Sequence, residues 1–235
     1  MHGFAHRLVA VTASSAVLLA VAVVGLSGLA QAAVGGSEAS GWHVSYFQNT
    51  APYPSFAEAP SAGAAGIAML GFTAEDNTSL LVTDQKAQFP SLLGDLTGET
   101  ITATFTVSGV TGAFTYYDEG TPTNSCSTPA SARLYFQTSN ATGFDETHYW
   151  WSNPAAAVLA NGTFTVTAPV DGATWSDFYG HLGSTGAYSA GFSAAAGNVT
   201  SIGLSFGGGC FFENGVGTTN GSGTLTLDSF TAAAR

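Results

Sequence analysis

The side chains best suited to chemistry in this sequence are aromatic residues with polar neighbours. Tyr149, Trp150 and Trp151 are consecutive, and Trp175 stands two positions before Asp177. Because successive side chains of a strand point to opposite faces, at least one of the adjacent tryptophans should point away from a core. An exposed indole offers a flat apolar face to a sugar ring, and polar neighbours can bond the hydroxyls. These segments favour carbohydrate binding, although aromatic residues also dominate protein cores.

A second polar group precedes the aromatic run. Arg133, Tyr135 and Gln137 alternate with Leu134 and Phe136, so the first three should share one face of a strand. We expect the aromatic side chains of the two segments to stack on sugar rings, while guanidinium and amide groups bond hydroxyls. The predicted ligand-binding residues are Arg133, Tyr135, Gln137, His148, Trp150, Trp175 and Asp177, with Tyr135 and Trp150 as the stacking groups.

A serine hydrolase is disfavoured, although Gly203-Leu204-Ser205-Phe206-Gly207 matches the Gly-x-Ser-x-Gly pattern. That motif needs a helix directly after the serine turn, and here Gly208 and Gly209 follow. We expect Ser205 to lie on the polar face of an ordinary strand.

Carbohydrate-active enzymes stay an alternative, without an assigned catalytic residue. Glycoside hydrolysis requires two carboxyl groups about 5–10 Å apart, which the sequence cannot place. A polysaccharide lyase would need a base and a group that neutralises a uronate. The candidates for the two chemistries are the acids Asp118, Glu119, Asp145, Glu146, Asp177 and Glu213, the bases His148 and Tyr149, and the uronate contacts Arg133, Tyr135 and Gln137. A structural or adhesion protein of the envelope or matrix is a further alternative.

Metal-binding signals are weak. His43, His148 and His181 are far apart and lack the spacing of a zinc site. Calcium takes six to eight oxygen ligands. Glu213, in a loop, and Asp228, on the last strand, are the candidate ligands for a structural calcium ion, and no other cofactor is expected.

Charge restricts the partners. The chain holds 15 acidic and 4 basic side chains and has a formal net charge of −11. Nucleic acids and anionic membranes attract basic patches, so both are disfavoured as partners. The expected partner is a polysaccharide or another glycan.

The first residues have the pattern of a signal peptide. His6 and Arg7 begin it, residues 8–29 are mostly apolar, and Ala30-Gln31-Ala32 is a cleavage site. We therefore predict a signal peptide over 1–32 and a secreted, extracellular domain over 33–235, which does not insert into a membrane after cleavage. Two cysteines in an exported chain predict one disulfide, Cys126–Cys210. Abundant Ala and Gly with few Lys indicate a GC-rich bacterial source.

Period-two alternation places these residues on strands. Apolar side chains alternate with Thr or Ser over 101–107, 163–167, 201–206 and 224–227, which is typical of half-buried strands with threonine outside. Pairs such as Asn161-Gly162 mark turns. The fold class predicted is an all-β, antiparallel jelly-roll β-sandwich, as a single domain. Further strands are expected over 43–48, 80–83, 113–118, 132–138 and 147–152, a short helix over 153–160, and surface loops over 57–71 and 207–223.

The order of several short motifs resembles a known family. It is similar to that of laminin IV-type domains and of carbohydrate-binding modules with a galactose-binding-like jelly roll. The resemblance covers about residues 89–232 and implies a noncatalytic sandwich that binds glycans. The motifs are Leu92-Leu93-Gly94-Asp95, Arg133-Leu134-Tyr135-Phe136, Tyr149-Trp150-Trp151, Gly162-Thr163-Phe164 and Leu225-Thr226-Leu227-Asp228-Ser229-Phe230.

Overall fold

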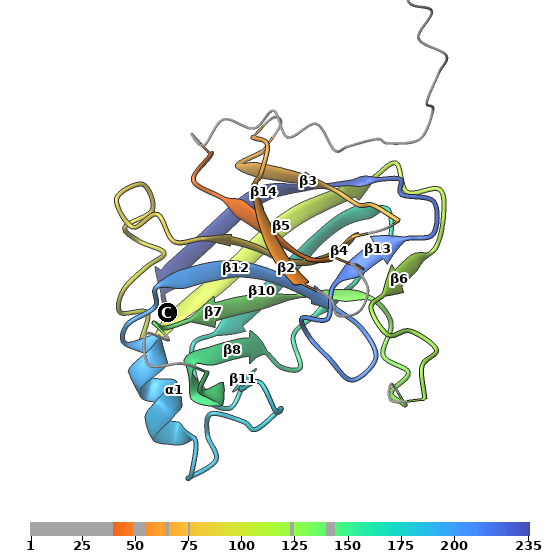
Figure 1. Cartoon of the computed structure of the whole chain (residues 1–235). Helices are drawn as coiled ribbons and strands as arrows, with labels where there is room; N and C mark the ends of the chain where they lie inside the picture. The colour runs from red at the N-terminus through yellow and green to blue at the C-terminus, as the bar shows by residue number, and fades with distance from the viewer. Residues whose placement is uncertain (1–39, 49–54, 64–65, 75, 123–124, 140–143) are drawn as a thin grey trace, which may run out of the picture.

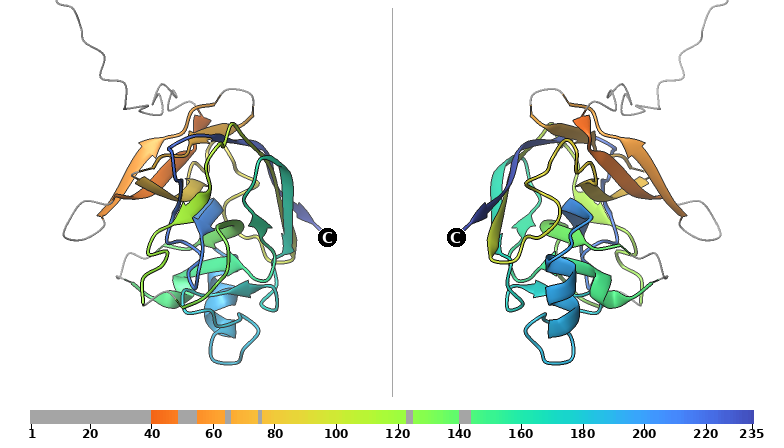
Figure 2. Two further views of the ribbon diagram at one scale, coloured as in Figure 1. Left: turned by 90° about the vertical axis from the view of Figure 1, so that its right-hand side faces the viewer. Right: turned by 90° about the vertical axis from the view of Figure 1, so that its left-hand side faces the viewer.

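The structure is a computed structural model that describes residues 40–48, 55–63, 66–74, 76–122, 125–139 and 144–235. Two antiparallel sheets face each other across one apolar core (Figures 1 and 2). The chain crosses repeatedly between the sheets, and the predicted all-β antiparallel sandwich is confirmed. The segment predicted as a signal peptide lies outside the described residues.

The larger sheet carries the candidate site. Its order is β11-β8-β7-β12-β4-β1-β2, with β13 beside β4, β6 beside β13 and β9 beside β7. The strands are β1 (His43–Gln48), β2 (Ser55–Pro60), β4 (Asp76–Thr83), β6 (Phe114–Tyr116), β7 (Ser131–Gln137), β8 (Tyr149–Ser152), β9 (Ala157–Val158), β11 (Trp175–Ser176), β12 (Ser201–Gly207) and β13 (Val216–Thr218).

The smaller sheet has the order β10-β5-β14-β3. Its strands are β3 (Ala68–Gly71), β5 (Glu99–Ser108), β10 (Gly162–Pro169) and β14 (Thr224–Ala234). Phe105 and its apolar neighbours on β5 point into the core, whereas the threonines point outward, as predicted. Three pairs of threonine hydroxyls join β5 to β10 at 2.9–3.1 Å, namely Thr102–Thr167, Thr104–Thr165 and Thr106–Thr163.

One α-helix, α1 (Ser189–Ala196), covers an end of the described sandwich, next to the short 3₁₀ helix η2 (Glu146–His148) (Figure 1). Phe192 of α1 packs edge-on against Trp150, with 5.0 Å between ring centroids. The helix was not predicted, because eight residues rich in alanine give a weak periodic signal. Within the described residues, no helix is long and apolar enough to cross a membrane.

Three segments differ from the sequence prediction. The expected loop over 57–71 contains the end of β2 and all of β3, and the expected loop over 207–223 contains β13. The expected helix over 153–160 is absent, and part of this segment forms β9, which pairs with β7. In all three segments a neighbouring strand supplies hydrogen-bond partners that weak local propensity does not reveal.

The predicted disulfide Cys126–Cys210 is confirmed, with 5.0 Å between the Cα atoms. Cys126 precedes β7 and Cys210 follows β12, and these two strands are paired from Ser131–Gly207 to Gln137–Ser201. The bridge therefore fixes the loop after β12 at the edge of the candidate site.

Candidate functional site

The outer face of the larger sheet is covered by a second, smaller apolar cluster. Tyr135, Trp151, Leu80 and Val82 form this cluster, and Phe212 packs against it. Leu134 and Phe136 instead belong to the main core, so Arg133, Tyr135 and Gln137 do share the outer face of β7. Tyr135 is only 1% exposed, however, and its hydroxyl donates to Oε1 of Gln137. The expectation that Tyr135 stacks on a ligand is therefore wrong.

Trp150 and Trp175 are core residues, which corrects their predicted role as sugar contacts. Both have no exposed surface. The Nε1 of Trp150 donates to the carbonyl of Thr147 at 2.7 Å, and that of Trp175 to the carbonyl of Pro169 at 2.8 Å. Trp150 pairs with Phe136, a core residue of β7, so the alternation of β8 turns Trp151 to the outer face. Sequence alone could not show which of the adjacent tryptophans points inward.

Arg133 supports the loop after β12 from beneath. Its guanidinium lies 4.0 Å from the ring centroid of Phe212 and donates to the carbonyls of Ser152 at 2.8 Å and Pro154 at 3.4 Å. Burial lowers the pKa of Arg133. Arg133 was predicted to bond sugar hydroxyls directly. Its side chain is buried, so this prediction is wrong.

Asp177 shapes the turn that follows β11. Its buried carboxylate accepts from the backbone N–H groups of Tyr179 at 3.0 Å and His181 at 2.9 Å, and lies 3.0 Å from Nδ1 of His181. The prediction that Asp177 contacts a ligand is wrong, because every one of these partners belongs to its own turn. Asp177 instead fixes the backbone that presents Phe178 and Tyr179.

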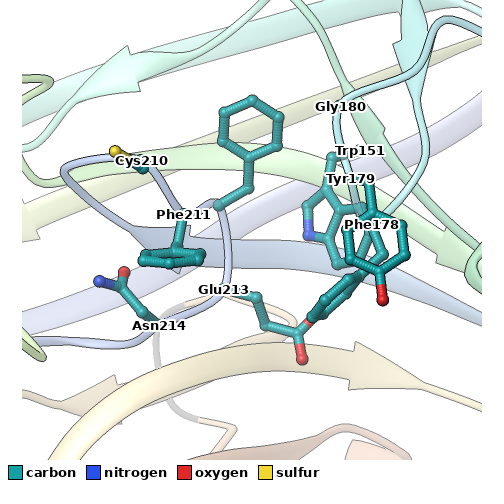
Figure 3. A pocket seen from close by; sticks show the side chains of 9 residues that line it. Trp151, Phe178, Tyr179, Gly180, Cys210, Phe211, Glu213 and Asn214 are labelled. Atoms are coloured by element: carbon teal, nitrogen blue, oxygen red, sulfur yellow. The ribbon is translucent and has the colours of Figure 1, made fainter. Parts of the chain in front are cut away.

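A cleft of about 340 Å³ lies between this turn and the loop after β12 (Figure 3). Trp151 lines it from the sheet, Phe178 and Tyr179 form one wall, and Phe211 and Glu213 belong to the other. The rims are unusually apolar: Phe178 is 48% exposed, Tyr179 63% and Phe211 49%. The cleft thus combines an aromatic lining with one carboxyl group.

The loop after β12 is held in place by backbone contacts. Ser205 donates to the carbonyl of Phe212 at 2.6 Å and accepts from Nε1 of Trp151 at 3.0 Å. Ser79 donates to the carbonyl of Glu213 at 2.7 Å. Ser205 is fully buried rather than on a polar surface, because this loop covers it. Its hydroxyl therefore has a structural use.

Glu213 has a perturbed acidity. Burial raises the pKa of its carboxyl to about 8. Its Oε2 atom is buried and has no hydrogen-bond partner among the described residues. The pKa of Tyr135 is raised well above its usual value, first by burial and then by the negative charges of Glu213 and Tyr149. At neutral pH the cleft therefore presents a mainly uncharged carboxyl group.

The candidate calcium ligands Glu213 and Asp228 belong to different sheets. Asp228 lies exposed on β14 and accepts from the hydroxyl of Thr106 at 2.8 Å. Glu213 sits against β4 on the larger sheet, so the thickness of the sandwich separates the two carboxyls. The described residues contain no group of three or more His, Cys, Asp or Glu placed to hold a metal ion. The two acids do not form one ligand set.

Gln137 and His148 stay partly exposed but do not line the aromatic cleft. Gln137 borders a separate, more polar hollow of about 370 Å³ on the same face, together with His43 and Glu58. His148 ends η2 at the start of β8. The structure therefore does not bring the predicted binding residues into one site.

The residues that line the cleft had detectable sequence signals. Phe178-Tyr179 follow Trp175 closely, and Phe211-Phe212 are adjacent aromatic residues in a glycine-rich loop. Aromatic pairs in loops lack a strand partner to bury them, which is a reason to expect exposure. No protein-family model, curated protein or solved structure matches this chain.

Proposed function

We propose that this protein is an exported, noncatalytic β-sandwich that binds an extracellular carbohydrate in the aromatic cleft. The observation that carries the proposal is the set of exposed rings, Phe178, Tyr179 and Phe211, around Trp151. Exposed apolar rings gathered at a concave site cost stability in water and are typical of ligand-binding surfaces. Sugar rings suit them, because their C–H faces are apolar and their edges carry hydroxyls.

The rings are held before any ligand arrives. Trp151 is fixed by its hydrogen bond to Ser205, and Phe178 contacts it with 6.1 Å between ring centroids. Tyr179 is held by Asp177 through its backbone. A preformed site loses less conformational entropy on binding than a disordered one. This rigidity supports recognition of a defined ring rather than unspecific apolar adsorption.

An acid–base enzyme is the second candidate, favoured by one observation. A carboxyl group with its pKa raised to about 8 is in the protonation state of a general acid. Glycoside hydrolysis also needs a second carboxyl across the cleft. Among the described residues that line the cleft, Glu213 is the only carboxylic acid. The geometry therefore supports binding better than hydrolysis.

The proposal is tested by affinity electrophoresis and pull-down on a panel of soluble and insoluble polysaccharides. The wild type should be retained by at least one polymer without releasing reducing or unsaturated ends. Tyr179→Ala and Phe211→Ala should each weaken retention by up to about 10-fold, since a stacked aromatic contact contributes about 0.5–1.5 kcal/mol.

Val158→Ala is the matched control, because Val158 is an exposed apolar side chain that does not line the cleft. Absence of retention on every polymer, or equal retention of all three variants, would contradict the proposal.

A further inference from the structure

The carboxyl group of Glu213 differs from the other polar groups of the cleft in its hydrogen bonding. Its backbone carbonyl accepts from Ser79, yet its Oε2 atom is buried and has no hydrogen-bond partner in the part of the chain that the structure describes. Figure 3 shows the carboxyl extending from the loop after β12 toward the rings of Phe178 and Tyr179. A buried polar atom without a hydrogen bond costs about 1–3 kcal/mol, so its persistence at a cleft points to a bond made with a ligand.

Burial disfavours the charged form of Glu213, and the titratable side chains that face it are phenols. Tyr135 faces it from β7 with Tyr149 of β8 beside that phenol, and Tyr179 lines the opposite wall. Arg133 of β7 stacks on Phe212 and donates to the main-chain carbonyls of Ser152 and Pro154. In the turn after β11, Asp177 is paired with His181.

An anionic ligand would bind weakly in this cleft. The faces of aromatic rings carry partial negative charge, and no basic side chain lines the cleft among the described residues. A carboxylate that left water for this lining would lose hydration without gaining a counter-charge. A neutral sugar has hydroxyls that both donate and accept, which matches what an uncharged carboxyl group offers.

We propose that the uncharged carboxyl of Glu213 binds sugar hydroxyls as donor and acceptor together, so that the cleft takes neutral sugar units, excludes uronates and releases its ligand when Glu213 ionises. This inference rests on the proposed function and adds to it the charge class of the ligand. It also makes Glu213 the residue that determines specificity.

The test is isothermal titration of the wild type with neutral oligosaccharides and with uronate oligosaccharides, at pH 6 and pH 9.5. With the pKa of Glu213 at about 8, about 3% of the carboxyl is uncharged at pH 9.5. Affinity for the neutral sugars should therefore fall at least 10-fold between the two pH values. Uronates should bind at least 10-fold more weakly than neutral sugars at pH 6.

Two variants locate the effect. Glu213→Gln keeps a neutral donor and acceptor of similar shape, so it should bind within about 3-fold of the wild type at pH 6 and lose the fall at pH 9.5. Glu119→Gln removes an exposed carboxyl that does not line the cleft, and should keep the wild-type pH profile. Circular dichroism checks that both variants fold. If Glu213→Gln does not fold, the comparison of wild-type affinity at pH 6 and pH 9.5 still tests the inference.

The outcomes separate the two ideas. Equal affinity at both pH values, a fall that persists in Glu213→Gln, or uronates bound as tightly as neutral sugars would overturn this inference and leave the proposed function intact. A wild type that binds no sugar at pH 6 would overturn both.

Discussion

Trp150 and Trp151 are adjacent in the chain, but their side chains lie on opposite faces of the larger sheet. Trp150 fills the core, whereas Trp151 lies on the outer face and lines a cleft. The same division separates Phe136 from Tyr135 on the adjacent strand. At the scale of single residues, function therefore depends on which member of an alternating pair the sandwich leaves outside.

Glu213 should also make stability depend on pH. Its pKa is about 8 in the folded protein, against an ordinary value of 4.5. Between these values the unfolded chain releases this proton while the folded protein retains it. Stability should therefore fall as pH rises from about 4.5 to 8, by at most about 1.4 kcal/mol per pH unit.

Urea unfolding at pH 5, 6.5, 8 and 9 measures this effect. Glu213→Gln should lose that part of the slope, while Glu119→Gln should retain it apart from changes in general charge repulsion. If the two variants and the wild type decline in parallel, the carboxyl of Glu213 is already ionised in the folded protein.

At the scale of elements, the turn after β11 depends on one carboxylate. Asp177 accepts hydrogen bonds from the backbone of Tyr179 and His181, and pairs with the ring of His181. Asp177→Ala should lower the free energy of unfolding by about 2–3 kcal/mol, because it removes the backbone hydrogen bonds that a buried, charged carboxylate accepts. It should also weaken ligand binding, since Phe178 and Tyr179 lose their fixed backbone.

Hydrogen exchange provides the decisive readout for this turn. The amides of Tyr179 and His181 should exchange faster in Asp177→Ala, whereas His181→Ala should leave the Tyr179 amide protected. Unchanged protection of both amides in Asp177→Ala would show that the turn holds its shape without the carboxylate.

At the scale of the whole molecule, the disulfide joins segments 84 residues apart. The chain-entropy model assigns such a loop about 4–5 kcal/mol as an upper figure. Replacing both cysteines by serine should therefore lower Tm by about 10 °C, because each kcal/mol shifts a domain of this size by about 2–4 °C.

The same replacement should weaken ligand binding more than Tyr179→Ala does, because Cys210 begins the wall that carries Phe211 and Glu213. Differential scanning calorimetry and titration with a bound oligosaccharide measure the two effects. An unchanged Tm together with unchanged affinity would show that the hydrogen bonds from Ser79 and Ser205 hold the wall without the bridge.

The sequence by itself determined the longer alternating strands and their two faces. Alternation of Phe105 with threonine, or of Leu134 with Arg133, follows from the period of a single strand and needs no knowledge of its neighbours. The disulfide followed from the count of two cysteines together with the predicted export signal. The helix over Ser189–Ala196 was not predicted, because its alternation of apolar and polar residues is short and weak.

Only the tertiary structure decided which outer faces stay open. Tyr135 and Arg133 point away from the main core as predicted, yet the loop after β12 covers them. That loop lies on the sheet because of long-range contacts from Ser79 and Ser205. Coverage of a face depends on segments far apart in the chain, and local periodicity carries no information about them.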